Sequence, residues 1–276
     1  MKWTFPSITI LVVALLVSAC SSTPDKEATE QELYEDARRA IKLRNFNQAT
    51  IALEELESRF PFGKYAEQAQ LDLVYARYSS LDLDGAILAA ERFIRLHPQS
   101  PNVDYAYYLK GIANYHLDLG VASQYFPMVE ESARDPGHMR TAFDDFKELV
   151  ERFPESRYAA DARQRMLQIR NRLAEYELHV ARYYVRREAY LAAANRAAYV
   201  VKHFPNSPSV EDALIMMVEL YELLQLDNQA PDALAVLAAN FPEGKAFDAN
   251  MRFKPQLIEK HRRSLKSVVT YGLLDE

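Results

Sequence analysis

Apolar residues recur along the chain with helical spacing, and the pattern ends at a proline in five places. The five prolines are Pro61, Pro98, Pro154, Pro205 and Pro242. Twelve residues before each proline stands an alanine, and apolar residues stand eight and five residues before it. Steps of four and three residues place these positions on one face of a helix. The pattern therefore predicts five helices that each pack through this face and end at the proline.

Proline accounts for the end of each helix, because it lacks the backbone N–H and disfavours helical geometry at the residue before it. That preceding residue is a phenylalanine in four segments and His97 in the other. The small alanine lets a neighbouring helix approach closely, and the larger residues fill the groove beside it. This combination is typical of the second helix of a tetratricopeptide repeat, a helix–turn–helix unit of about 34 residues.

Matching first helices precede most of these segments. Periodic stretches of this kind cover residues 31–44, 65–79, 103–119 and 210–224. Thr29 and Glu32 have the spacing of a capping box at the start of the first stretch. We therefore expect an all-α fold, a tetratricopeptide-repeat superhelix of about five repeats.

Two repeats carry insertions, because the prolines are 37, 56, 51 and 37 residues apart. The first insertion falls at residues 120–137, which contain two prolines and two glycines and are expected to form a loop. The second insertion lacks both residue types and predicts one long helix over residues 156–187. We expect this helix to stiffen the junction between an N-terminal repeat group, residues 29–155, and a C-terminal pair of repeats, residues 156–242.

Composition supports helices and argues against several classes of function. Only 7 of the 276 residues are glycine, whereas tight turns and phosphate-binding loops need this residue. The formal net charge is −6, which is not the charge of a nucleic-acid-binding protein. The six histidines show no metal-binding spacing, and no catalytic motif is present. We therefore expect a binding protein without enzymatic activity, metal or cofactor.

The N-terminal residues have the layout of a bacterial lipoprotein signal. Lys2 is followed by an apolar stretch at residues 8–17, which is too short to span a bilayer. The stretch leads into the sequence VSAC, which resembles a lipobox and places the only cysteine of the chain, Cys20, at the acceptor position. The alternative is an ordinary signal peptide with a chance cysteine.

The lipobox resemblance implies removal of residues 1–19 and lipidation of Cys20, with S-diacylglycerol on the thiol and an N-palmitoyl group on the new amine. Three acyl chains anchor a protein firmly, since two already suffice. Ser21, in place of an aspartate, implies sorting to the periplasmic face of the outer membrane. Residues 20–28 are small and polar, as in a flexible tether.

Residues 243–276 form a basic tail. Between residues 244 and 270, seven lysines and arginines stand against two acidic residues, although the chain as a whole is acidic. Such a stretch suits an acidic partner or anionic lipid, and it equally suits a solvated terminal helix.

Six sequence strings are more specific than a repeat consensus. They are RFPFGKY at 59–65, QLDLVYA at 70–76, ERFIRLHP at 91–98, NVDY at 102–105, RDP at 134–136 and ANR at 194–196. Strings like these occur in the same order in the BamD family, the lipoprotein subunits of the outer-membrane β-barrel assembly machinery, which the chain resembles from Cys20 to about Pro242.

The resemblance implies a non-catalytic role in outer-membrane protein assembly. Family members bind unfolded outer-membrane proteins in a groove of their N-terminal repeats and dock through their C-terminal repeats on a periplasmic POTRA domain of BamA. They also join smaller lipoproteins of the same complex. The alternative is another periplasmic tetratricopeptide-repeat lipoprotein, such as an adaptor to peptidoglycan synthesis or Tol-Pal, or a secretin pilot.

The resemblance places substrate contacts where the first repeat turns into the second, at Phe60, Phe62, Gly63 and Tyr65. Tyrosine offers a wide contact area with little entropy loss, which suits an extended peptide with an aromatic end. Packing is the alternative for Phe60, which holds the last core position of its repeat, and also for Phe62 and Tyr65. Gly63 alternatively permits a positive φ in the turn.

Arg196 stands nine residues before its proline, where three of the other four repeats have alanine. In the family an Asn-Arg pair at this place contacts a carboxylate of BamA, and Asn195 and Arg196 match that pair. Arginine can bind a carboxylate through two parallel hydrogen bonds. Tyr183 and Arg187 are further candidates for this interface, and a solvated surface side chain is the alternative for Arg196.

Four tyrosines crowd the predicted helix over residues 103–119, namely Tyr105, Tyr107, Tyr108 and Tyr115. Adjacent residues on a helix do not face the same way. We therefore expect Tyr107 or Tyr108 to face the groove or solvent, with packing alone as the alternative.

Overall fold

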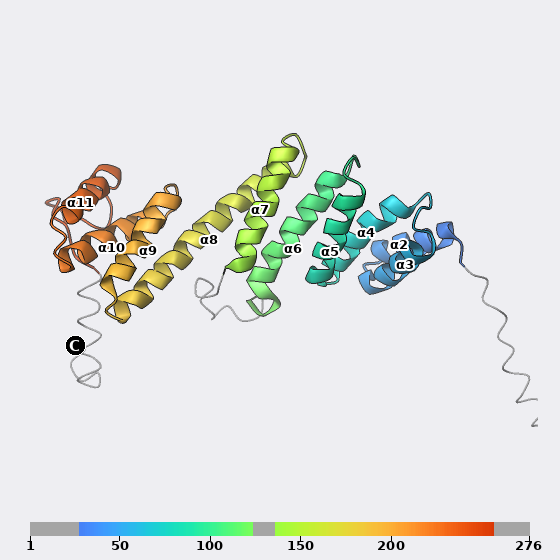
Figure 1. Cartoon of the computed structure of the whole chain (residues 1–276), viewed down its shortest axis with the longest axis horizontal. Coiled ribbons are helices and arrows are strands. Elements are labelled where there is room, and N and C mark those ends of the chain that lie inside the picture. Colours follow the sequence, from blue (N-terminus) through green and yellow to red (C-terminus); the bar gives the residue numbers. More distant parts are fainter. Residues whose placement is uncertain (1–27, 124–135, 257–276) are drawn as a thin grey trace, which may run out of the picture. The chain divides into compact units, whose positions relative to one another are not determined.

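The computed structural model describes residues 28–123 and 136–256, and its regular secondary structure there is entirely helical (Figure 1). An isolated β-bridge joins Phe247 and Phe253. The predicted all-α fold is thus confirmed for the described residues. The lipobox with Cys20 and the last part of the basic tail lie outside them. None of the described helices is both long enough and apolar enough to cross a membrane.

The chain divides into two compact units, Met1–Ala69 and Gln70–Glu276. In the first unit, α2 (Glu30–Lys42) and α3 (Phe46–Arg59) form a helical hairpin. The predicted capping box is present, since the Glu32 N–H donates to Thr29 Oγ1 and the Thr29 N–H donates to Glu32 Oε2 at 2.8 Å. The helices pack through small and aliphatic residues: Leu33, Ala37, Ala40, Ala49, Ala52, Leu53 and Leu56.

In the second unit, the helices from α5 to α11 each pack mainly on their neighbours in sequence, as repeat proteins do (Figure 1). The helix α4 begins in the first unit and continues into this one. The helices are α4 (Ala66–Ser79), α5 (Leu83–Leu96), α6 (Val103–Ser123), α7 (Gly137–Arg152), α8 (Ala159–Arg186), α9 (Tyr190–His203), α10 (Val210–Leu223) and α11 (Gln229–Asn240).

All five predicted helix ends are confirmed. The residue before each proline is the C-cap, and its backbone N–H donates to the carbonyl four residues earlier at 2.8 Å in every case. The five alanines twelve residues before the prolines are all buried. The repeat positions read from the sequence are therefore the packing positions of these helices.

The two predicted insertions differ in outcome. The long helix is present as α8 with 28 residues, and it begins three residues later than expected because Ser156 forms a turn in which its Oγ accepts the Tyr158 N–H at 3.2 Å. The predicted loop over residues 120–137 is wrong at its start, since α6 continues through Gly120 to Ser123. A single glycine lowers helix stability without ending the helix, and residues 124–135 lie outside the described part.

Part of the basic tail packs against the last two helices. Ala246 is fully buried, and Phe247 and Phe253 pack on the apolar cluster formed by α10 and α11. The Gln256 N–H donates to the buried carboxylate of Glu219 at 2.6 Å. Residues 243–256 therefore close the end of the C-terminal hairpin with their own side chains.

Candidate functional site

The turn between α3 and α4 carries the four residues expected to contact substrate. Phe60 is the C-cap of α3 and is half-buried, with the Arg59 guanidinium 5.3 Å from the centre of its ring. Phe62, by contrast, is 99% exposed. A fully exposed phenylalanine gains nothing for the fold by burial, so it is available for contact with another molecule.

Glu30, from the start of α2, holds this turn in place. Its Oε1 accepts the backbone N–H of Tyr65 at 2.6 Å. A Cβ atom on Gly63 would lie 2.2 Å from the same oxygen. The alternative that Gly63 permits a positive φ is wrong, because its φ is outside the left-handed region. The Glu30 carboxylate instead occupies the space that a Cβ atom would take.

Tyr65 joins the turn to α2 through its ring. The ring stacks on that of Tyr34, with centroids 4.7 Å apart, and the Lys64 ammonium lies 5.4 Å from the Tyr65 ring centre. Stacked and cation–π contacts of this kind each contribute a modest stabilisation. Tyr65 is thus partly a packing residue, whereas Phe62 projects from a turn that Glu30 and Tyr34 of α2 contact through Tyr65.

The second predicted region centres on Arg196 of α9. Its Nη1 donates to Glu177 Oε2 of α8 at 2.7 Å. The side chain of Glu177 is only 5% exposed, whereas that of Arg196 is 44% exposed. The hydrogen bond that Arg196 donates to Glu177 raises the pKa of Arg196 above its usual value, so the guanidinium stays charged. The ion pair therefore presents its positive member to solvent and keeps its negative member inside.

The other residues predicted for this interface lie near it on the same two helices. Asn195 is exposed on α9. Tyr183 is half-exposed, and its ring centre lies 6.0 Å from that of Tyr184, whose hydroxyl also contributes to holding Arg196 charged. Arg187 is the exposed C-cap of α8, where its backbone N–H bonds the Tyr183 carbonyl at 3.2 Å. The structure thus connects Tyr183 to Arg196 through Tyr184 and leaves Arg187 at the helix end.

Two residues of this region were not anticipated from the sequence. Glu177 is buried, and Arg140 of α7 reaches its Oε1 at 3.6 Å. One signal could have revealed Glu177, because it lies four residues after Leu173 and four before Ala181, both on the buried face of α8. A charged residue at an apolar position of a helix needs a partner of opposite charge. No comparable signal points to Arg140.

The tyrosines of α6 pack against neighbouring helices. Tyr107 is buried and tilts against Phe153, whereas Tyr108 is half-buried and donates its hydroxyl to Asp161 of α8 at 2.7 Å. The rings of Tyr108 and Tyr158 stack with centroids 4.7 Å apart. Burial, with the Asp161 hydrogen bond, raises the pKa of Tyr108 to about 12. The two adjacent tyrosines do face different neighbours, as expected, but both serve packing.

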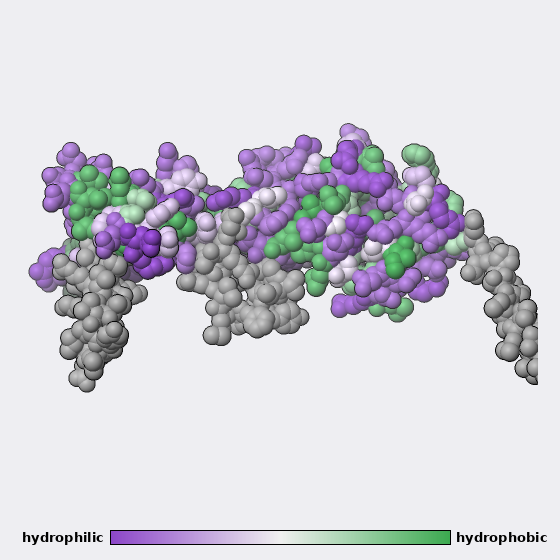
Figure 2. Space-filling model, turned by 60° about the horizontal axis from the view of Figure 1, so that its bottom comes forward, coloured by the Kyte–Doolittle hydropathy of each residue, from purple (hydrophilic) through white to green (hydrophobic). Residues whose placement is uncertain are grey.

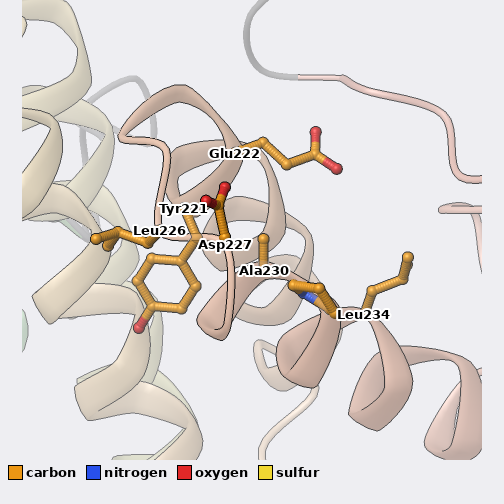
Figure 3. A pocket seen from close by; sticks show the side chains of 7 residues that line it. Tyr221, Glu222, Leu226, Asp227, Ala230 and Leu234 are labelled. Atoms are coloured by element: carbon orange, nitrogen blue, oxygen red, sulfur yellow. The ribbon is translucent and has the colours of Figure 1, made fainter.

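An open pocket of about 330 Å³ lies at the turn between α10 and α11 (Figure 3). Figure 3 shows the carboxylates of Glu222 and Asp227 on one side of it and the Tyr221 ring on the other. Apolar surface is visible over the C-terminal helices in Figure 2. Leu223 of α10 and Val236 of α11 are half-exposed. None of the residues predicted from the sequence to contact a partner or substrate lines this pocket. Within residues 28–123 and 136–256, no three histidine, cysteine, aspartate or glutamate side chains group as metal ligands would.

Comparisons with known proteins agree with the sequence resemblance. A protein-family model described as YfiO, outer membrane lipoprotein, matches residues 26–237. A relative from Neisseria gonorrhoeae, named outer membrane protein assembly factor BamD, is 41% identical over 239 residues, which cover 84% of this chain and 89% of the relative. A Vibrio cholerae protein of the same name is 38% identical over 80% of this chain and 92% of its own length.

Among solved structures, the crystal structure of MamA protein is 15% identical, covers 78% of this chain and 92% of its own, and has a TM-score of 0.38. The sequence matches extend across both compact units and across both predicted regions of contact. This chain is therefore a member of the YfiO family of outer membrane lipoproteins, the family of the proteins named outer membrane protein assembly factor BamD.

Proposed function

We propose that the chain is a non-catalytic, lipid-anchored subunit of the outer-membrane β-barrel assembly machinery. The observation that carries this proposal is the match to relatives named as assembly factors, at 41% and 38% identity over most of both chains. In this role the protein works by binding other polypeptides. Its partners are BamA, the smaller lipoproteins of the complex and unfolded outer-membrane proteins.

The anchor is the lipidated Cys20, which carries S-diacylglycerol and an N-palmitoyl group after removal of residues 1–19. Residues 20–28 tether the first helical hairpin to the periplasmic face of the outer membrane. Acyl chains in this number provide stable attachment without a membrane-spanning helix.

The N-terminal repeat group, residues 29–155, binds segments of unfolded outer-membrane proteins at the α3–α4 turn. Phe62 makes the contact, because it is fully exposed on a turn that the Glu30 carboxylate holds rigid. Phe60, Gly63 and Tyr65 shape the surface around it. A rigid aromatic side chain binds an apolar or aromatic partner residue at little cost in conformational entropy.

The C-terminal repeats, residues 156–242, dock on a POTRA domain of BamA through Arg196, Asn195, Tyr183 and Arg187. Arg196 supports this assignment because its guanidinium is charged and half-exposed, with Nη1 bonded to Glu177 at 2.7 Å and Tyr184 beside it. Its remaining N–H groups are suited to a carboxylate on the partner. Arginine and tyrosine are also the residue types that most often dominate the energy of protein interfaces.

The experiment that tests this proposal is replacement of Arg196 by glutamate in the lipidated full-length protein at native expression level. We expect BamA to be lost from detergent-solubilised co-purification, while the circular dichroism spectrum remains helical. The matched control is Arg152→Glu, a charge reversal at a 61% exposed arginine on α7. Undiminished BamA recovery with Arg196→Glu would count against the docking surface, and absence of BamA from the wild-type preparation would count against the function itself.

A further inference from the structure

Three helices meet at one buried carboxylate in the second unit. Glu177 of α8 binds Arg196 of α9 through Oε2 at 2.7 Å and Arg140 of α7 through Oε1 at 3.6 Å. Each oxygen of the carboxylate therefore takes one guanidinium. The two arginines come from different repeats, and the single carboxylate places them side by side.

The charges of this cluster do not cancel. Two guanidinium groups face one carboxylate, which leaves one positive charge in excess. The carboxylate is 5% exposed, whereas the arginine side chains are 53% and 44% exposed for Arg140 and Arg196. Two like charges held this close repel one another, and a second carboxylate arriving from outside would relieve that repulsion.

Geometry favours a carboxylate as the ligand. A guanidinium has five N–H donors in a planar fork. Arg196 uses one of its donors on Glu177, whereas Arg140 pairs with Glu177 at 3.6 Å, beyond hydrogen-bond distance. Both arginine side chains are about half-exposed, so solvent reaches them on α7 and on α9. A carboxylate has two acceptor oxygens, so it can bridge two guanidinium groups from outside as Glu177 bridges them from inside.

We propose that Arg140 and Arg196 together bind one aspartate or glutamate side chain of the docked partner, and that Glu177 is the positioning residue that holds both arginines ready. This inference rests on the proposed docking function and extends it to α7. Preorganisation is the physical reason for the role of Glu177, because side chains already fixed in place lose less entropy on binding.

The first test measures binding of the purified periplasmic region of BamA to full-length protein by biolayer interferometry. We expect Arg140→Gln to weaken binding about tenfold, and Arg152→Gln, an exposed arginine on the same helix, to leave it unchanged. Because both arginines hold the same carboxylate, Arg140→Gln should add little to Arg196→Gln in the double variant. Full additivity, or an Arg140→Gln variant that binds like wild type, would overturn the shared site.

The second test separates positioning from charge. Glu177→Gln makes the cluster more positive by one unit, so simple attraction of an acidic partner predicts tighter binding. If Glu177 positions the arginines, the dissociation rate instead rises severalfold while the association rate does not fall. A dissociation rate equal to or slower than that of wild type would refute the positioning role.

The outcomes for the two proposals are distinct. If wild type binds BamA and Arg196→Gln weakens it while Arg140→Gln does not, only the two-arginine site fails. If wild type does not bind BamA, the proposed function fails and the site fails with it. Thermal unfolding followed by circular dichroism shows whether Glu177→Gln is folded, and the Arg140→Gln result stands independently of that variant.

Discussion

The hairpins α6–α7 and α8–α9 place an ion pair at the same repeat position with opposite polarity. Nine residues before the proline, α7 carries Asp145 and α9 carries Arg196. Asp145 binds Lys110 of α6 at 3.0 Å, and Arg196 binds Glu177 of α8 at 2.7 Å. In both hairpins the second helix is thus tied to the first by a charge pair, where the other repeats have alanine.

The two ion pairs differ in whether the positively charged side chain is exposed to solvent. In α6–α7 both members are largely enclosed, with side-chain exposures of 17% for Lys110 and 7% for Asp145. Lys110 also meets Glu91 at 3.3 Å, and Asp145 accepts a hydrogen bond from Asn114 at 2.8 Å. In α8–α9 the cation is half-exposed. One repeat position therefore serves internal stability in one hairpin and presents a binding group in the other.

The largest effect is expected from breaking the enclosed pair. Lys110→Met leaves the Asp145 carboxylate buried beside the Asn114 amide with no cation, and loss of one member of a buried pair costs about 3–5 kcal/mol. We expect a loss of this order in the free energy of unfolding measured with urea. Lys147→Met, at an exposed lysine of α7, is the control.

A second variant sharpens the interpretation of that loss. Lys110→Met combined with Asp145→Ala removes both charges and restores the alanine found in other repeats, so most of the lost stability should return. If the double variant is as unstable as the single one, packing around Lys110 and not the unpaired carboxylate is responsible.

A smaller effect on stability is expected from Arg196→Gln, about 1 kcal/mol, because Arg140 remains beside Glu177 and the lost contact is half-exposed. The same urea titration measures it. Its effect on partner binding should exceed its effect on folding, which is the reverse of the order expected for Lys110→Met. Equal destabilisation by the two variants would mean that both pairs are structural.

The smallest effect is expected from the protonation of His116, which lies on α6 and makes stability depend on pH. His116 of α6 stacks on Tyr78, bonds its hydroxyl at 3.1 Å through Nδ1, and also faces Tyr115 and Arg165. Burial, reinforced by the Arg165 charge, lowers the pKa of His116. Below about pH 6.5 the unfolded chain takes up a proton that the folded protein resists, so stability falls as the pH drops.

The measurement compares wild type with His116→Gln between pH 7.5 and about pH 5. As the pH falls, we expect the free energy of unfolding of the wild type to decrease relative to that of the variant, by less than about 1.4 kcal/mol per pH unit. The difference between the two proteins isolates His116 from the other histidines. A constant difference across this range would show that His116 does not resist protonation in the fold.

The repeat helices could be predicted from the sequence, because the buried face and the end of each helix depend on residues close together along the chain. The spacing of Ala193, Ala197 and Val200 before Pro205 predicts both a buried face and a helix end, and all three residues are fully buried. The start of α8 was harder to predict, because it depends on Ser156 bonding the backbone of Tyr158 and the side chain of Asp104. Gly120 was expected to begin a loop, but it lies within α6, because the helix as a whole and not this one residue decides where it ends.

The residues of the candidate sites also fall into two groups: some stand out in the local sequence, and others act through contacts with distant residues. Arg196 was noticeable because a large cation stood where alanine was usual, and Phe62 because it belonged to a distinctive string. Glu30 was not noticeable, although its carboxylate explains Gly63 and the backbone geometry of Tyr65. Its contact spans 35 residues along the chain, and no local pattern encodes a contact at that separation.

The sequence by itself determined the helices, their ends at proline and the family, because these follow from periodicity and from strings of adjacent residues. Only the tertiary structure decided that Arg196 is anchored to a buried glutamate, that Arg140 shares that anchor, and that Asp145 at the equivalent position is enclosed. The physical reason is that exposure and pairing of a charge depend on which helices surround it, and a linear pattern records the type of residue but not its surroundings.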